Sequence, residues 1–167
     1  MGDRVVTLVP VDGVVLERLV AAATSGAAAG EVTPPVTAGD DWTPERVAWL
    51  RAFHLDRRAG LDGEAGEATW AVLLDGQAVG GVRLARVAKD DVLEAGVWLT
   101  RQVRGSGVGR AAVAALLDEA AALGAVAVRA ETTAGNAAAL AVLRQLGFEC
   151  SDSGDGTVRA QVALREQ

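Results

Sequence analysis

The sequence predicts a protein of the α/β class, with a mixed, mostly antiparallel sheet of about seven strands and about four surrounding helices. Its 167 residues suffice for about one domain. With 50% hydrophobic and 23% charged residues, the chain has the composition of a folded globule. Strand-like and helix-like segments alternate along it without an internal repeat or a linker. We therefore expect a single domain over residues 1–167.

The first quarter of the chain predicts a strand, a helix and a loop. Residues 4–9 (RVVTLV) are mostly β-branched, which is typical of a strand. Asp12 can cap a helix over residues 14–23, where apolar residues recur at helical spacing. Glycines and the pair Pro34-Pro35 predict that residues 24–41 form an irregular loop.

A second helix and three antiparallel strands are predicted next. Thr43 as N-cap and Pro44 at the first helical position predict a helix that runs to about residue 60. Trp49 and Phe53 lie one helical turn apart and are expected on its buried side. The strands are expected at residues 69–74, 77–88 and 92–99, with Asp75-Gly76 as the first turn.

The last third of the chain contains the clearest helix. Between Gly107 and Leu123 apolar residues recur every three or four positions, and Gly124 stands where a left-handed residue ends a helix. The remaining elements are a strand at 125–131, a helix at 136–146 that stops before Gly147, and a closing hairpin at 148–152 and 157–164.

Charge and cysteine content exclude several classes of function. The formal net charge of −6 and the pI of about 4.8 argue against binding nucleic acid through phosphate contacts, and favour a cationic partner. Cys150 is the only cysteine, so an intrachain disulfide or a thiolate-rich metal site cannot form, and we interpret it as structural. Neither a signal-peptide pattern nor an apolar run of about 18 residues is found. We expect a cytoplasmic protein with no membrane contact and no metal.

A glycine-rich turn is the segment of the sequence that most clearly predicts a ligand site. A strand runs into residues 104–109 (RGSGVG) and then directly into the long helix. Glycines let the backbone approach a ligand closely, and the first turn of a helix offers unpaired N–H groups at the positive end of its dipole. This pattern predicts a pyrophosphate site formed by Arg104, Gly105, Ser106, Gly107, Val108, Gly109 and Arg110.

A dinucleotide site is the rival interpretation of the same turn. Gly107-x-Gly109-x-x-Ala112 satisfies the fingerprint G-x-G-x-x-G/A, and Glu131 falls about 20 residues onward, where a ribose-binding acid would lie. That fold places the turn at the start of its first βαβ half, however, and too little chain follows Gly109 to build the rest. Antiparallel strands also precede the turn.

The stretch from Glu94 to Phe148 resembles the GCN5-related N-acetyltransferases (GNAT). Arg104-x-x-Gly107-x-Gly109 is similar to their pyrophosphate loop, and Asn136 with Gly147-Phe148 matches a second family signal. The order of elements over essentially the whole chain is similar to the family's fold. Within the family, the last helix most resembles the branch that acetylates ribosomal-protein N-termini and its small-amine relatives.

The resemblance implies a ligand and a reaction. Acetyl-CoA would be the cosubstrate, with its pantetheine held by the backbone of Val97, Trp98 and Leu99, its pyrophosphate held by residues 104–110, and Asn136 near the pantetheine end. A primary amine, either a protein N-terminus or a small molecule, would attack the thioester directly in a ternary complex. Relatives often pair through edge strands, so a homodimer is also implied.

Glu94 is the candidate catalytic base, because an attacking amine must first lose a proton. The alternatives are that Glu94 is merely solvated or paired with an arginine, and that His54, the only histidine, is the base. No general acid is assigned: Leu143 stands where many members carry a tyrosine, and Ala139 where the N-terminus branch carries a serine. A CoA-binding module without catalysis therefore remains a rival function.

Other residues have two interpretations each. The four tryptophans are expected in the core, although they could line an acceptor pocket. The acids beside the early loop are expected to be ordinary surface, although they could attract a cationic amine. These residues are Trp42, Trp49, Trp70, Trp98, Glu31, Asp40 and Asp41.

Overall fold

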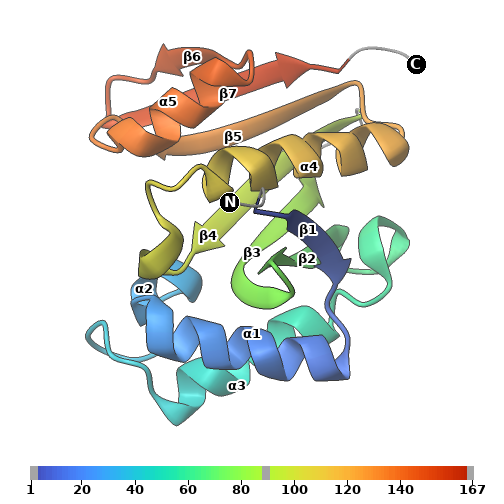
Figure 1. Ribbon diagram of the computed structural model, residues 1–167. Coiled ribbons are helices and arrows are strands. Elements are labelled where there is room, and N and C mark those ends of the chain that lie inside the picture. Colours follow the sequence, from blue (N-terminus) through green and yellow to red (C-terminus); the bar gives the residue numbers. More distant parts are fainter. Residues whose placement is uncertain (1–3, 88–90, 165–167) are drawn as a thin grey trace.

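The computed structural model describes residues 4–87 and 91–164 and contains one seven-stranded sheet with helices on both faces (Figure 1). The strands lie in the order β1-β2-β3-β4-β5-β7-β6. All neighbours pair antiparallel except β4 and β5, which are parallel. The predicted class, a mixed and mostly antiparallel sheet, is confirmed. The strands are β1 (Val6–Pro10), β2 (Glu67–Leu74), β3 (Gln77–Arg86), β4 (Val92–Leu99), β5 (Ala127–Thr133), β6 (Glu149–Asp152) and β7 (Thr157–Ala163).

Over residues 4–87 and 91–164, five α-helices and two short 3-10 turns connect the strands. Four of the helices match the predicted ones, and α2 is additional. They are α1 (Gly13–Gly26), α2 (Ala29–Val32), α3 (Pro44–Leu55), α4 (Val108–Ala122) and α5 (Ala137–Gln145), with 3-10 turns η1 (Gly60–Asp62) and η2 (Arg101–Val103).

The local signals for caps and turns are confirmed. Asp12 accepts a hydrogen bond from the N–H of Val15 at 2.9 Å, which caps α1. Asp75 and Gly76 have φ values of 50° and 84°, as the tight turn between β2 and β3 requires. Gly124, with φ of 88°, ends α4 in the left-handed conformation.

The early loop is shorter than predicted, because α1 continues to Gly26 and α2 follows. Gly26 does not break the helix: a Cβ atom there would lie 2.7 Å from the side chain of Thr100, so the glycine is required by a close tertiary approach. Ala29, at the start of α2, is fully buried. The predicted loop over 24–41 is therefore wrong for its first half.

Two further boundaries differ from prediction. Helix α3 ends at Leu55 rather than near residue 60, and the Arg57 guanidinium donates to the carbonyl of Phe53 at 2.9 Å, which satisfies a helix end. β5 begins two residues late, because the N–H of Ala125 still closes α4 by donating to Ala120 at 3.0 Å. Ala88, at the end of a predicted strand, lies outside the described residues.

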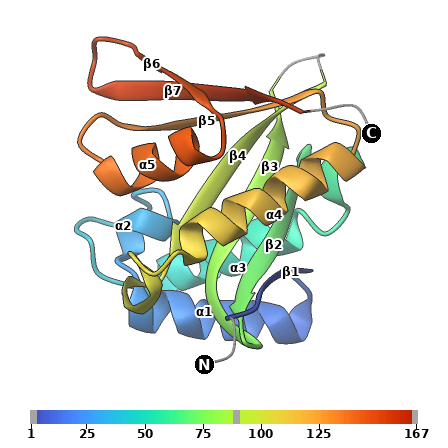
Figure 2. The same cartoon turned by 45° about the horizontal axis from the view of Figure 1, so that its top comes forward.

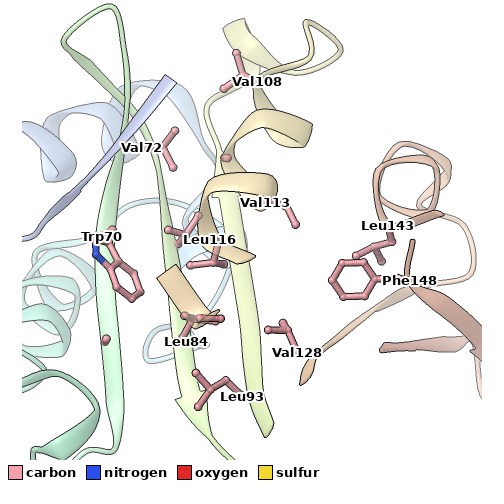
Figure 3. Packing of buried hydrophobic residues seen from close by; sticks show 14 of the residues in the cluster. Trp70, Val72, Leu84, Leu93, Val108, Val113, Leu116, Val128, Leu143 and Phe148 are labelled. Atoms are coloured by element: carbon pink, nitrogen blue, oxygen red, sulfur yellow. The ribbon is translucent and has the colours of Figure 1, made fainter. Parts of the chain in front are cut away.

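The sheet separates two hydrophobic clusters. Helices α4 and α5 cover one face, and α1 and α3 cover the other face over β2–β4 (Figures 1 and 2). Figure 3 shows Leu116 of α4 directed toward the sheet near Leu84 of β3, and both side chains are fully buried. No helix within the described ranges is long and apolar enough to cross a membrane.

Replacing Leu116 by Ala should lower the free energy of unfolding by about 3 kcal/mol, because it leaves a cavity between α4 and the sheet. Leu123→Ala is the matched control: this leucine, just after α4, is 47% exposed, and its removal should change stability by at most about 0.5 kcal/mol. Urea unfolding followed by circular dichroism measures both. Equal effects would contradict the assigned core.

Candidate active site

β4 and β5 pair over three residues and then diverge (Figure 2). The last pair joins Glu94 to Arg129, whereas β4 continues to Leu99 and β5 to Thr133. Over residues 95–99, β3 pairs with one side of β4, and no strand of the described chain pairs with the other side. This edge of β4 can therefore hydrogen-bond an extended ligand as a further strand would.

The glycine-rich turn follows at the end of this edge. Gly105 and Gly107 have φ values of 75° and 87°, which glycine adopts without strain, and a Cβ atom at either would find open space. Within the described ranges, no hydrogen bond uses the backbone N–H groups of residues 105–110. With the positive end of the α4 dipole, these groups form a site suited to an anion such as pyrophosphate.

The Arg104 side chain links this turn to α2. Its guanidinium donates to the carbonyl of Leu99 at 3.1 and 2.9 Å and to Glu31 at 2.7 Å. A hydrogen bond from the N–H of Ala28 lowers the pKa of Glu31, and the charge of Arg104 lowers it further. Arg110 is exposed and has no hydrogen bond or ion pair to any described residue. Arg110 is thus the arginine of the turn that has no charged partner among the described residues.

The remaining predicted ligand residues lie around the same divergence. Val97, Trp98 and Leu99 occupy the free edge of β4, and the Val97 side chain is 41% exposed. Asn136 caps α5, where its Oδ1 accepts from the N–H of Ala139 at 3.1 Å. One lone pair of Asn136 Oδ1 is therefore used in the cap, and its amide NH2 group, which has no hydrogen bond to a described residue, can contact a ligand.

A cavity of about 650 Å³ lies on the face of β2–β4 that α1 and α3 cover. It is enclosed by the sheet, α3 and the segment after α1. Glu94 borders this cavity, and it also borders a second hollow of about 910 Å³ over the outer face of β5–β7–β6. Trp49, Phe53 and Trp98 contribute aromatic walls to the smaller cavity, and Pro34 contributes part of its rim. Its volume is in the range of small-molecule sites.

Arg46 holds the rim of this cavity in place. Its side chain, only 1% exposed, donates to the hydroxyls of Thr33 and Thr37 at 3.2 and 3.1 Å and to the carbonyl of Gly39 at 2.6 Å. The sequence analysis missed this residue, because its partners lie in a segment predicted to be irregular. The segment between α2 and α3 is instead fixed around a buried guanidinium.

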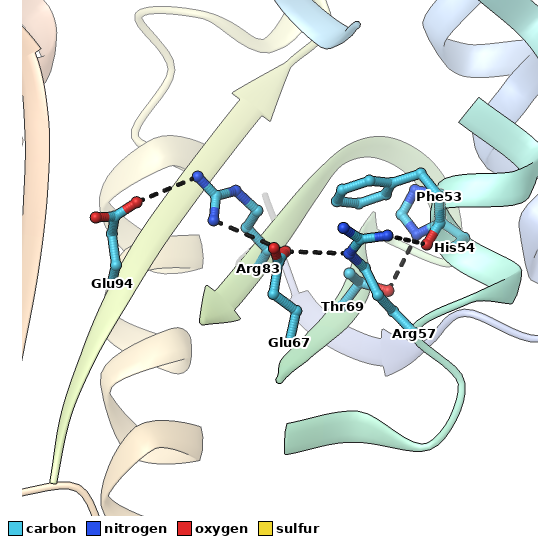
Figure 4. A network of polar contacts seen from close by, with 7 residues as sticks. All are labelled: Phe53, His54, Arg57, Glu67, Thr69, Arg83 and Glu94. Carbon is cyan, nitrogen blue, oxygen red and sulfur yellow. Dashed lines mark hydrogen bonds and ion pairs between the residues drawn. The ribbon is translucent and has the colours of Figure 1, made fainter. Parts of the chain in front are cut away.

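Four charged side chains alternate in sign beside the cavity (Figure 4). Arg83 Nη2 lies 3.5 Å from Glu94 Oε1, and Arg83 Nη1 lies 3.8 Å from Glu67 Oε2. Glu67 Oε2 also lies 3.2 Å from Arg57 Nε, and the Arg57 guanidinium stacks 3.7 Å above the ring of Phe53. Glu94 is thus paired with an arginine, which the sequence analysis had left open, and the network is electrically neutral.

His54 is buried and uncharged at neutral pH. It is 4% exposed, and its Nδ1 lies 3.0 Å from the Thr69 hydroxyl. Burial, and then the positive charge of Arg57, lower the pKa of His54 to about 4. Because His54 is almost fully buried and its Nδ1 contacts Thr69, an amine can reach it less easily than Glu94, whose side chain is 34% exposed, and this favours Glu94 as the base.

The tryptophans and acids divide between core and surface. Trp70 is in the core and 7% exposed, Trp49 and Trp98 line the cavity, and Trp42 donates to the carbonyl of Ala27 at 2.9 Å. Asp40 and Asp41 are exposed. Cys150 is a free, half-buried thiol. Within the described ranges, no cluster of three or more His, Cys, Asp or Glu could hold a metal ion.

Sequence comparison decides the family. The family model described as "Acetyltransferase (GNAT) domain" matches residues 16–149. The chain belongs to the GNAT acetyltransferase family. The dinucleotide interpretation is not supported, because the strands of the described chain form one parallel pair and not a parallel sheet. Among curated proteins, none matches this chain significantly.

Solved structures share the GNAT fold at low identity. RimJ of Mycobacterium smegmatis, in complex with CoA-disulfide, has a TM-score of 0.74 and 20% identity over 95% of this chain and 81% of its own. A chimera of the spermidine N-acetyltransferase SpeG from Vibrio cholerae and hSSAT has a TM-score of 0.69 and 15% identity over 95% of both chains. The Escherichia coli ribosomal-protein-S18-alanine N-acetyltransferase has a TM-score of 0.62 and 18% identity over 98% of this chain and 96% of its own.

The buried state of His54 predicts a pH dependence of stability. As the pH falls below 6.5, His54 of the unfolded chain binds a proton, whereas His54 of the native protein binds one only near pH 4. The free energy of unfolding should therefore fall by about 3 kcal/mol in total over this window, and this contribution should not change above it. His54→Gln should remove that part of the pH dependence in urea unfolding.

The same prediction has a direct readout. Because His54 is the only histidine, its Cε1 proton gives one NMR signal. In the native protein the signal should titrate near pH 4, and in concentrated urea near 6.5. Titration of the native signal near 6.5 would mean that the imidazole is exposed.

Proposed function

We propose that this protein transfers the acetyl group of acetyl-CoA to a primary amine. The observation that carries the proposal is the free edge of β4 leading into the unused N–H groups of residues 105–110. An extended pantetheine can pair with the free edge of β4, and a pyrophosphate can accept hydrogen bonds from the N–H groups of residues 105–110. The CoA-disulfide bound to RimJ adds support from a protein of the same fold. The acceptor is a small-molecule amine or a protein N-terminus.

The proposed reaction proceeds by direct attack in a ternary complex. Glu94 borders the acceptor cavity at the last residue before the strands diverge, and its carboxylate takes a proton from the ammonium group, directly or through water. The amine nitrogen then bonds to the thioester carbon, the carbon–sulfur bond breaks, and the nitrogen releases its second proton to solvent to give the neutral amide. The thiolate leaves with the bonding electrons and takes a proton from solvent, since a thiol has a pKa of only about 8.5. Transfer by this route needs no enzyme nucleophile, so Cys150 has no role in it.

A CoA-binding module without catalysis is the second candidate. The chain contains no tyrosine, and Leu143, at the position of the family's tyrosine, is buried in the core. Such a module would bind CoA through the same glycine-rich turn and leave amines unchanged. Turnover with an amine panel separates the two candidates.

Gly107→Val should weaken acetyl-CoA binding at least about tenfold, because a β-branched residue strains a left-handed backbone and displaces the N–H groups. Gly154→Val is the matched control: Gly154 also has positive φ, 80°, and open space, but lies in the turn between β6 and β7. Calorimetric titration with acetyl-CoA, CoA and NADH measures both. Binding of NADH but not CoA, or equal loss in both variants, would contradict the pyrophosphate site.

Glu94→Gln should reduce kcat by about 100-fold or more while the affinity for acetyl-CoA is retained, because the amide cannot accept the proton. Glu131→Gln serves as the control, since Glu131 is also a strand glutamate paired with an arginine, Arg159, at 3.3 Å. The assay follows release of the CoA thiol with each amine. Unchanged turnover in Glu94→Gln would exclude Glu94 as the base.

A further inference from the structure

Two cross-strand pairs of β3 and β4, each made of one glycine and one large side chain, shape the floor of the 650 Å³ cavity. Arg83 lies opposite Gly96, and Trp98 lies opposite Gly81. A Cβ atom at Gly96 would come within 2.6 Å of Arg83 Nε, and one at Gly81 within 2.7 Å of Trp98 Nε1. Each glycine therefore lets the opposite side chain lie flat on the sheet. The result places a guanidinium and an indole side by side on the floor.

Arg83 is held loosely by its two acids. Its contacts to Glu94 and Glu67 measure 3.5 and 3.8 Å, well beyond the usual length of a charge-assisted hydrogen bond. Its side chain is 36% exposed. The guanidinium carries five N–H donors in a planar fork that matches a carboxylate, and most of them have no acceptor among the described residues. It is therefore available to an anionic group of a ligand.

The charge balance of the cavity disfavours a ligand with several ammonium groups. Three described acids line the cavity, and each already has an arginine partner: Glu31 has Arg104, Glu67 has Arg57, and Glu94 has Arg83. A single ammonium at Glu94 would share that carboxylate with Arg83, whose Nη2 lies 3.5 Å from Glu94 Oε1, and the two positive charges would repel. A carboxylate next to that ammonium would remove the repulsion, because it would lie against Arg83.

A zwitterion fits these facts, and an α-amino acid carries its ammonium and carboxylate on the same carbon. Set antiparallel to the Glu94–Arg83 pair, the ligand ammonium contacts Glu94 and its carboxylate contacts Arg83, so the site stays neutral. The side chain of the ligand then faces Trp49, Phe53 and Trp98, which favour a large apolar group.

We propose that the acceptor is a free α-amino acid with a large apolar side chain, and that Arg83 binds its carboxylate and determines specificity. This inference rests on the proposed function, because it names the amine that Glu94 deprotonates. It excludes a polyamine, which has no carboxylate, and a protein N-terminus, in which the carboxylate is replaced by an amide.

The test compares L-phenylalanine with phenethylamine, which has the same ring and amine but no carboxylate. In the wild-type protein kcat/KM for L-phenylalanine should exceed that for phenethylamine, spermidine and an alanine-initiated peptide by at least about tenfold, since only L-phenylalanine offers Arg83 a carboxylate beside the reacting amine. L-Alanine should be acetylated more weakly than L-phenylalanine, because it leaves the aromatic walls uncovered.

Arg83→Gln should lower the ratio of kcat/KM for L-phenylalanine to kcat/KM for phenethylamine at least about tenfold, so that the preference disappears whatever the change common to both amines. Arg83→Lys, which keeps the charge but not the fork, should retain part of the preference and replaces the first variant if that one does not fold. Arg51→Gln is the control: this arginine of α3 pairs with Glu17 at 2.8 Å and should not affect the ratio.

Three results would overturn the proposal. Equal losses for both ligands in Arg83→Gln would make Arg83 a general structural residue. A preference for spermidine or for the peptide in the wild-type protein would assign another acceptor and leave the acetyltransferase function intact. Acetyl-CoA binding without transfer to any amine would contradict the proposed function itself, and the inference with it.

Discussion

The short parallel pairing of β4 and β5 is the constraint on which the rest of the site depends. After Glu94 the two strands part, and the edge of β4 over residues 95–99 loses its neighbour on one side. Backbone polar groups on such an edge need a partner, and an extended ligand can supply it. The same strand ends at the glycine-rich turn, which offers the N–H groups of residues 105–110. One strand therefore aligns the edge, the anion site and the carboxylate of Glu94.

The two halves of the site are connected through side chains as well as through β4. Arg104 belongs to the glycine-rich turn, yet its guanidinium binds Glu31 of α2 and the carbonyl of Leu99. On the other face, Arg46 fixes the segment between α2 and α3 that forms the cavity rim. The cavity that we propose for the acceptor is thus built on contacts to the proposed cosubstrate side and not on a free loop, which is consistent with a reaction that needs both substrates aligned.

Local signals in the sequence predicted much of the fold, and tertiary contacts account for what they missed. The turn at Asp75-Gly76 and the end of α4 at Gly124 depend on backbone dihedrals that few residues adopt, so the sequence alone specifies them. Gly26 was misinterpreted because its reason is the approach of Thr100, distant in sequence. Arg83 was missed as well, although alternation along β3 and β4 and the hairpin register would have placed it on the same face as Glu94.

The central claim, that the diverging strands and the glycine-rich turn bind acetyl-CoA, is tested most directly by a crystal structure of the protein with CoA. The account predicts pantetheine amides hydrogen-bonded to the edge of β4 over residues 95–99 and a pyrophosphate on the N–H groups of residues 105–110, with the sulfur directed toward Glu94. CoA bound elsewhere, with β4 and the turn unoccupied, would contradict it.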